Sequence, residues 1–303
     1  MSKGKKAVNA GEELLQIIKK TTVMAMFSDD ELFELLVLKG GNAMDLIHQS
    51  HARASVDVDF SLSGDLDVEE TKPRIERALK RSFAEHKYLA FDVAMDERPS
   101  NITSEDLAKF WGGYEISFKL IEQERAQQVG ENLETMRREA IRLGGQNTKF
   151  TIDISRYEYT EAKEPYELEG MTIYAYPPAM IVCEKLRAIC QQMPEYGLVI
   201  SRTKGAGHQR ARDFIDIDVL LNSDRFKVDL DSPSVQEMLR EVFKVKRVPL
   251  QLLGKIKETR EFHKNGYPEV KDAMRPGIPV KPFEEYFNTV VNACERLKPI
   301  WNI

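Results

Sequence analysis

Cysteine is scarce in this sequence, and the cysteines that are present follow no disulfide or metal-binding pattern. The 303 residues include only Cys183, Cys190 and Cys294. An odd number without a CxxC pair argues against a disulfide framework and against a zinc knuckle. Cys183 and Cys190 lie seven residues apart in a run with helical spacing, so we expect them to be small packing side chains.

Long apolar runs and an excess of positive charge are also missing. No apolar run is long enough to span a bilayer. The first residues, MSKGKKAVNAGEELL, carry lysines without an apolar segment behind them, which is not the pattern of a secretory signal. The net charge of −5 predicts no general attraction to nucleic acid or membrane. We therefore expect a cytoplasmic protein with no membrane partner, in which any contact with nucleic acid needs local basic patches.

Signs of covalent nucleophilic catalysis are absent as well. The sequence contains no G-x-S-x-G, and its five histidines are scattered. His48 and His51 lie three residues apart, but the carboxylates nearby suit a hard cation better than imidazole does.

Hydrophobic spacing predicts a mixed α/β first half. Residues 10–27 have helical spacing, and Ser28 or Asp29 can N-cap a second short helix. A buried strand over 35–38 ends at a Gly-Gly turn, a helix follows over 42–50, and 56–62 alternates like a half-buried strand. Later segments predict helices over 68–87 and 122–142, strands over 91–95, 114–120 and 150–157, and a strand pair within 166–176 that turns at Glu169-Gly170.

The second half has a different character. Pro177-Pro178 interrupts the strand pattern. Helical spacing then recurs over 179–192, 209–222, 233–243, 250–263 and 282–297. We predict an α/β domain over residues 1–177 and a helical domain over residues 178–303.

Two carboxylates follow the Gly-Gly turn closely. Strand alternation sends Asp57 and Asp59 to the same face, where two like charges are costly unless a cation lies between them. Carboxylate oxygens suit Mg²⁺, which takes phosphate oxygens as further ligands. The turn at Gly40-Gly41 opens a helix, where free N–H groups can bind an anion. Together these features predict a Mg²⁺–triphosphate site; two solvated aspartates at a strand edge are the alternative.

The residues around this turn resemble a known family. Lys39-Gly40-Gly41-Asn42-Ala43, followed by Arg53-x-Ser55-x-Asp57-x-Asp59-Phe60, is similar to the AbiEii/AbiGii-type nucleotidyltransferase toxins of the DNA polymerase β-like superfamily. The resemblance implies an α+β fold, with a mixed sheet and flanking helices followed by a helical C-terminal domain. It implies that Gly40, Gly41, Arg53 and Ser55 contact the nucleotide phosphates. Asn42 stands where the family usually has Thr or Ser, and its amide is expected to replace that contact.

Later segments fit the same resemblance. The family implies a third metal-binding carboxylate, for which Asp153 in FTIDIS is our candidate and Glu115 in YEISF the rival. EKLRAI matches a family helix whose Lys185 would meet the triphosphate as a point charge. RDFID matches another, whose Asp213 would complete the site or hold Lys185 in place.

Two basic segments remain. SRTKGAGHQRAR, residues 201–212, contains Arg202, Lys204, His208, Arg210 and Arg212 and no acid, so it can grip the triphosphate or the phosphates of an RNA, or be a solvated loop. The run Lys244, Lys246, Arg247, Lys255 and Lys257 is expected to be a solvated helix face.

The resemblance implies a Mg²⁺-dependent enzyme that transfers NMP from an NTP to an acceptor hydroxyl with release of pyrophosphate. The implied acceptor is tRNA, in a toxin–antitoxin or abortive-infection (phage defence) system with a cognate antitoxin protein as partner. Self-modification or another protein acceptor stays open. The alternatives are a nucleotide-binding or interaction module without catalysis, and a small-molecule nucleotidyltransferase that uses the same metal site.

Overall fold

The computed structural model describes residues 2–50, 57–100, 102, 104–142, 147–202, 207–274 and 279–302, with side chains from residue 11 onward. Seven strands form one mixed sheet in the order β3-β4-β5-β2-β1-β7-β6. The strands are β1 (Val37–Lys39), β2 (Val58–Ser61), β3 (Tyr88–Arg98), β4 (Gly113–Glu122), β5 (Phe150–Ser155), β6 (Glu164–Leu168) and β7 (Met171–Ala175).

The centre of the sheet brings distant segments into register. β2 runs antiparallel to β1 and parallel to β5, so Asp59 lies between Lys39 on one side and Asp153 on the other. Along β5, Phe150, Ile152 and Ile154 are buried and the alternate residues are partly exposed. The period-two pattern of the sequence therefore places one row of side chains in the core and leaves polar residues on the opposite face.

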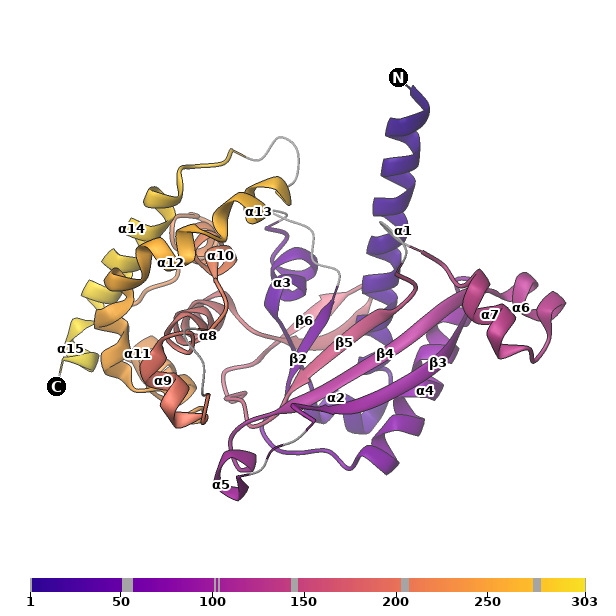
Figure 1. The fold of residues 1–303 in the computed structure, drawn as a ribbon, viewed down its shortest axis with the longest axis horizontal. Coiled ribbons are helices and arrows are strands. Elements are labelled where there is room, and N and C mark those ends of the chain that lie inside the picture. The colour runs from indigo at the N-terminus through magenta and orange to yellow at the C-terminus, as the bar shows by residue number, and fades with distance from the viewer. Residues whose placement is uncertain are drawn as a thin grey trace.

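Helices of the first half pack mainly on one face of the sheet (Figure 1). The two longest, α1 and α4, pack against each other, and Asp29 and Asp67 N-cap α2 and α4. The helical segments are α1 (Ser2–Phe27), α2 (Asp30–Leu35), α3 (Gly40–Asn42), the π-helix η1 (Ala43–Ile47), α4 (Val68–Ala84), α5 (Glu105–Ala108), α6 (Gln123–Val129) and α7 (Leu133–Glu139).

The chain after β7 is helical and gathers beside the sheet, in salmon to yellow in Figure 1. Its elements are α8 (Pro178–Cys190), α9 (Pro194–Val199), α10 (Ala211–Leu221), α11 (Pro233–Lys244), the 3₁₀ helix η2 (Leu250–Thr259), α12 (Arg260–Lys264), α13 (Tyr267–Asp272), α14 (Phe283–Arg296) and α15 (Lys298–Trp301). Prolines at the first turns of α8, α9 and α11 fit their helix starts, since proline lacks the N–H that has no partner there.

The expected fold class, a mixed sheet with flanking helices followed by a helical C-terminal region, is confirmed. Buried residues from both sides of position 177 belong to one continuous hydrophobic core, and the division into domains at that position stays a prediction. The three cysteines are buried and unpaired by disulfides, as the packing interpretation requires. Among the described helices, none combines the length and apolarity needed to cross a membrane.

Candidate functional site

Three sequence-predicted carboxylates meet at one cleft between the sheet and the helical region. Asp59 on β2 is the register neighbour of Asp153 on the adjacent parallel strand β5. Asp57 immediately precedes β2 and accepts a hydrogen bond from the Thr151 hydroxyl. All three line a cleft of about 460 Å³, which we call the main arm; its other walls come from the Gly40-Gly41 turn, α8, α10 and α13.

The carboxylates experience one another's charge. Burial, together with the charges of Asp153 and Asp57 and against the opposing charge of Lys39, raises the pKa of Asp59 to about 6. Burial and the charge of Asp57 also raise the pKa of Asp153. Within the described ranges, no group of three or more His, Cys, Asp or Glu side chains is arranged closely enough to be assigned as a metal site. The residues nevertheless fit a hard divalent cation chemically, because a cation would relieve this repulsion and carboxylate oxygens are its preferred ligands.

Glu115, the rival third carboxylate, is placed differently. It is the register neighbour of Asp153 on the far side from Asp59, and it accepts a hydrogen bond from Arg98 at 3.0 Å. It does not line the main arm, whereas Asp153 does. The geometry therefore favours Asp153 as the partner of Asp59.

The Gly40-Gly41 turn lies against Asp59. Gly40 has φ +66°, and a Cβ added there would stand 2.5 Å from Asp59 Oδ2. Asn42 is fully buried, and its Nδ2 donates a hydrogen bond to the backbone carbonyl of Asp57. Gly40 and Gly41 line the main arm and Asn42 does not. Asn42 thus ties the turn to the start of β2, and its contact with phosphate stays a prediction.

Replacing Gly40 tests how tightly the turn and the carboxylate are fitted. In Gly40→Ala, the methyl group adds backbone strain of about 1–2 kcal/mol and displaces the Asp59 carboxylate. We expect transfer activity to fall roughly 100-fold, since a displacement of about 1 Å has that effect in other sites. Gly130→Ala is the matched control, because Gly130 has φ +65° and a Cβ there meets nothing within 4 Å. Equal activity of the two variants in a turnover assay would contradict this fit.

Lys185 and Asp213 are brought together across the cleft from the carboxylates. The Lys185 Nζ lies 2.9 Å from Asp213 Oδ1 and 2.7 Å from Asp216 Oδ2, and all three side chains are buried. Arg210 Nε donates to Asp213 Oδ2 at 2.6 Å. Of the two predicted roles for Asp213, holding Lys185 in place matches this contact; the contact of Lys185 with triphosphate stays a prediction.

Arg210 is a cation of the cleft that belongs to none of the family motifs. It lines the main arm, and Asp213, followed by Glu184 and Asp59, raises the pKa of its guanidinium against the effect of burial. Its backbone N–H donates to Nδ1 of buried His263 at 3.0 Å, which fixes the start of α10. In the sequence, only its position in the basic segment 201–212 indicated that Arg210 could contact phosphate.

The residues of the two basic segments lie in different environments. In the first, Arg210 and Arg212 line the main arm, whereas Arg202 donates to the carbonyls of Gln191, Gln192 and Met193 at the end of α8. In the second, the expectation of a solvated helix face is wrong for Lys246, which is 4% exposed. It follows α11 and folds inward, where its Nζ donates to the carbonyls of Arg156 and Phe110.

Some residues considered for the site do not line the main arm or fall outside the residues that the structure describes. Arg53, Ser55, His51 and Lys204 fall outside the described residues. His48 is buried, with Nε2 2.8 Å from the Tyr176 carbonyl, and burial lowers its pKa. That placement is consistent with a core histidine.

The raised pKa of Asp59 has a consequence for stability. An unfolded aspartate titrates near 3.8 and folded Asp59 near 6, so the folded state loses stability as pH rises through this interval. In metal-free buffer we expect Asp59→Asn to be more stable than the wild type above pH 6, by at most roughly 3 kcal/mol, and nearly equal below pH 4. Urea unfolding of both proteins at several pH values measures this; a constant difference from pH 4 to 7 would contradict it.

The site places acidic residues on neighbouring strands beside a glycine turn. The sequence motifs predict this combination for a nucleotidyltransferase. The chain belongs to the AbiEii nucleotidyl transferase toxin family of type IV toxin–antitoxin systems, since the model of that family matches residues 22–289. It is accordingly a nucleotidyltransferase, as predicted.

Two solved structures from Helicobacter pylori match this chain over nearly its whole length. A candidate nucleotidyltransferase superposes with a TM-score of 0.46 at 14% sequence identity, covering 100% of this chain and 98% of that chain. The protein JHP933 has a TM-score of 0.46 at 15% identity, covering 98% and 94%. No curated protein gives a significant match.

Proposed function

We propose that this nucleotidyltransferase transfers a nucleoside monophosphate from an NTP to a hydroxyl group of RNA, with tRNA as the acceptor. The observation that carries the proposal is the pairing of Asp59 with Asp153 on adjacent parallel strands, beside Gly40 and facing the Lys185–Asp213 pair. This arrangement supports a reaction on a charged phosphate group, because it combines carboxylates for a cation with cations for the phosphates.

The bonds change as follows. The acceptor oxygen attacks the α-phosphorus of the NTP, the bond from that phosphorus to the bridging oxygen breaks, and pyrophosphate leaves. Asp153 is the group proposed to receive the proton of the acceptor hydroxyl, because it lies beside Asp59 on the adjacent strand and lines the cleft. Arg210 and Lys185 offset the charge that develops on the leaving group, the kind of preorganised contribution that is worth about 3 kcal/mol per donor.

Asp57, Asp59 and Asp153 are the residues proposed to hold Mg²⁺. When bound, the ion supplies charge neutralisation of the phosphates and a lower pKa for the acceptor hydroxyl. Gly40 leaves room beside Asp59 for this arrangement, because any larger residue would contact the Asp59 carboxylate.

Incubation of the protein with each α-labelled NTP, Mg²⁺ and total tRNA tests the proposal. We expect one or more NTPs to label the RNA, and labelling to disappear in the double variant Asp57→Ala/Asp59→Ala. Labelling of the RNA to the same extent by wild type and double variant would contradict the assigned site. Mass spectrometry of cellular RNA after induced expression identifies the acceptor independently.

We further propose that the transfer blocks translation and thereby arrests growth during abortive infection. Membership of a type IV toxin–antitoxin family supports this, and it implies an antitoxin partner. Induced expression should stop growth in the wild type and not in the double variant, and co-expression of the gene encoded beside it should restore growth.

A further inference from the structure

The segment that leads into α10, residues 207–213, supplies a large part of the main arm. Gln209, Arg210, Ala211, Arg212 and Asp213 all line it. The Arg210 side chain is 36% exposed, and its Nε is engaged by Asp213 Oδ2 at 2.6 Å. In the part of the chain that the structure describes, Nη1 and Nη2 of Arg210 have no hydrogen-bond acceptor. This guanidinium therefore presents donors to the cleft, and its position depends on how the backbone of the segment is held.

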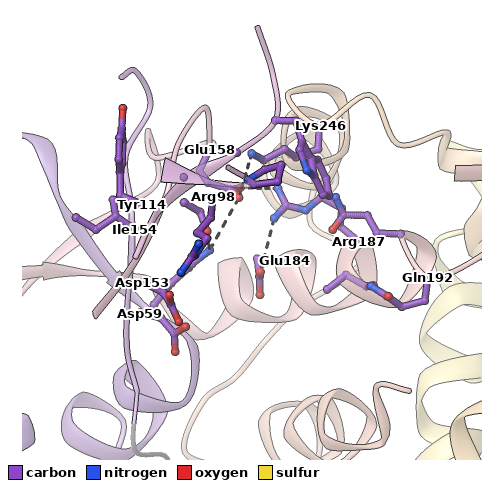
Figure 2. Close-up of a pocket in the computed structure, with 18 of the residues that line it drawn as sticks. Asp59, Arg98, Tyr114, Asp153, Ile154, Glu158, Glu184, Arg187, Gln192 and Lys246 are labelled. Atoms are coloured by element: carbon purple, nitrogen blue, oxygen red, sulfur yellow. Dashed lines mark hydrogen bonds and ion pairs between the residues drawn. The ribbon is translucent and has the colours of Figure 1, made fainter. Parts of the chain in front are cut away.

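The first residues of the segment are held at the end of α8. The Gln192 carbonyl accepts from the backbone N–H of Gly207, and Gln192 Oε1 accepts from that of His208, both at 2.8 Å. Figure 2 shows Gln192 at the opposite side of the view from Asp59 and Asp153. The segment thus starts away from these carboxylates, and the residues that reach the cleft need other contacts to fix them.

Those contacts come from α12 and the turn that follows it. His263 Nδ1 accepts from the backbone N–H of Arg210 at 3.0 Å. Arg210 is the N-cap residue of α10, and its side chain makes no capping hydrogen bond. Gly266 lies against Gln209, since a Cβ added at Gly266 would stand 2.8 Å from the Gln209 Cβ. Two consecutive positions of the segment are therefore held from the C-terminal helices.

The surroundings of His263 suit it to this acceptor role. It is fully buried, with ring centroids 5.1 Å from Phe214 and 4.9 Å from Phe262. Burial lowers its pKa to about 4, so the ring is neutral, with its proton on Nε2 and the Nδ1 lone pair directed to Arg210. Nε2 is buried and has no hydrogen-bond partner among the described residues. An apolar side chain would leave no such donor unsatisfied, so the bond made by Nδ1 is what histidine adds here.

We propose that His263 and Gly266 are positioning residues for nucleotidyl transfer, which fix the backbone at Gln209 and Arg210 so that the Arg210 guanidinium meets the departing pyrophosphate. The inference rests on the proposed function for the role of Arg210 at the leaving group. A cation stabilises developing charge most when it is already in place, because no reorganisation is then needed during the reaction. His263 is buried and acts through Arg210.

The test is a matched pair of substitutions, His263→Asn and His263→Leu. The two new side chains branch alike and differ little in size, but only asparagine places an acceptor where Nδ1 of histidine stands. Asparagine also buries an amide beside aromatic rings, so urea unfolding should find it no more stable than leucine. We nevertheless expect His263→Asn to keep kcat within about threefold of the wild type and His263→Leu to lose about 30-fold. The KM for NTP should change less than kcat, because the contact acts mainly in the transition state. A His263→Leu variant as active as His263→Asn would overturn the inference.

A double-mutant cycle connects this effect to Arg210. Arg210→Gln alone should lower kcat about 100-fold. In that background His263→Leu should lower kcat by no more than about twofold further, because no guanidinium is left to position. Effects that multiply in full would show that His263 acts on something other than Arg210 and would overturn the inference.

Gly266→Ala tests the second contact and does not depend on how well the His263 variants fold. The added methyl group displaces the backbone at Gln209, so kcat should fall roughly tenfold. Gly64→Ala is the matched control, because a Cβ at Gly64 meets nothing within 4 Å, and its kcat should equal that of the wild type. Thermal melting checks that both proteins are folded at the assay temperature. Equal kcat values for the two alanine variants would remove Gly266 from the proposal.

Calorimetric titration with Mg²⁺–pyrophosphate separates this inference from the identity of the acceptor, because it needs no RNA. The wild type and His263→Asn should bind with similar affinity, and His263→Leu and Arg210→Gln should each bind about tenfold more weakly. Equal affinity of all four proteins, or no binding by the wild type, would overturn the inference whatever the acceptor is. The expected order of affinities without labelling of RNA by the wild type would contradict the proposed function alone.

Discussion

Asp59→Asn is expected to abolish nucleotidyl transfer while leaving the protein folded. Asp59 is the central carboxylate, with Lys39 on one side in the sheet and Asp153 on the other. Loss of its negative charge weakens cation binding, which supplies several kcal/mol of transition-state stabilisation. Each 1.36 kcal/mol is a factor of ten in rate, so we expect kcat/KM to fall on the order of 1,000-fold or more.

The matched control is Asp224→Asn, because Asp224 is exposed and does not line the main arm. It should retain wild-type turnover of labelled NTP into RNA. The same Asp59→Asn protein should be at least as stable as the wild type at pH 7 without metal, so a loss of activity is separable from a loss of fold. Activity of Asp59→Asn within tenfold of the wild type would remove Asp59 from the reaction.

Lys185→Met is expected to destabilise the protein by about 3–5 kcal/mol, because it removes the cation from two buried carboxylates. Lys185 Nζ lies within 3 Å of both Asp213 and Asp216, and none of the three is more than 5% exposed. A loss of this size is a large part of the 5–15 kcal/mol that typically separates folded from unfolded protein. Urea unfolding measures it.

Lys255→Met is the comparison for an exposed ion pair, since Lys255 is 47% exposed and lies 2.6 Å from Glu195. Its cost should not exceed about 1 kcal/mol. In a double-mutant cycle, Asp216→Asn should recover part of the stability that Lys185→Met loses. Equal costs for the two lysines would show that Lys185 is held in a solvated environment.

Strong local patterns predicted most of the fold. The alternation in FTIDIS and around Asp57–Asp59 correctly predicted the strands β5 and β2. Asp29 N-caps α2, as one of the two residues considered for that position. The short helices α9 and α13 were not predicted, because six residues cannot show a helical period. The segment expected as one helix over 250–263 is the 3₁₀ helix η2 followed by α12, a difference that spacing alone does not reveal.

The gathering of the motif residues in one cleft could be predicted from the sequence, whereas positions that depend on tertiary packing could not. Asp57, Asp59, Asp153, Lys185 and Asp213 line the main arm together. The inward position of Lys246 depends on acceptors from Phe110 and Arg156, which lie far away in the sequence. Asn42 donates to the Asp57 carbonyl, a contact that depends on the closeness of α3 to β2, and its expected contact with phosphate stays a prediction.

This cleft is proposed to transfer a nucleoside monophosphate, which distinguishes it from a kinase and from a binding module without catalysis. Parallel reactions with α-labelled and γ-labelled NTP, Mg²⁺ and tRNA distinguish these outcomes directly. We expect the α label to enter the RNA and the γ label to be released as pyrophosphate, in equal amounts. Transfer of the γ label to the acceptor, or release of pyrophosphate without labelled RNA, would contradict nucleotidyl transfer to RNA by this cleft.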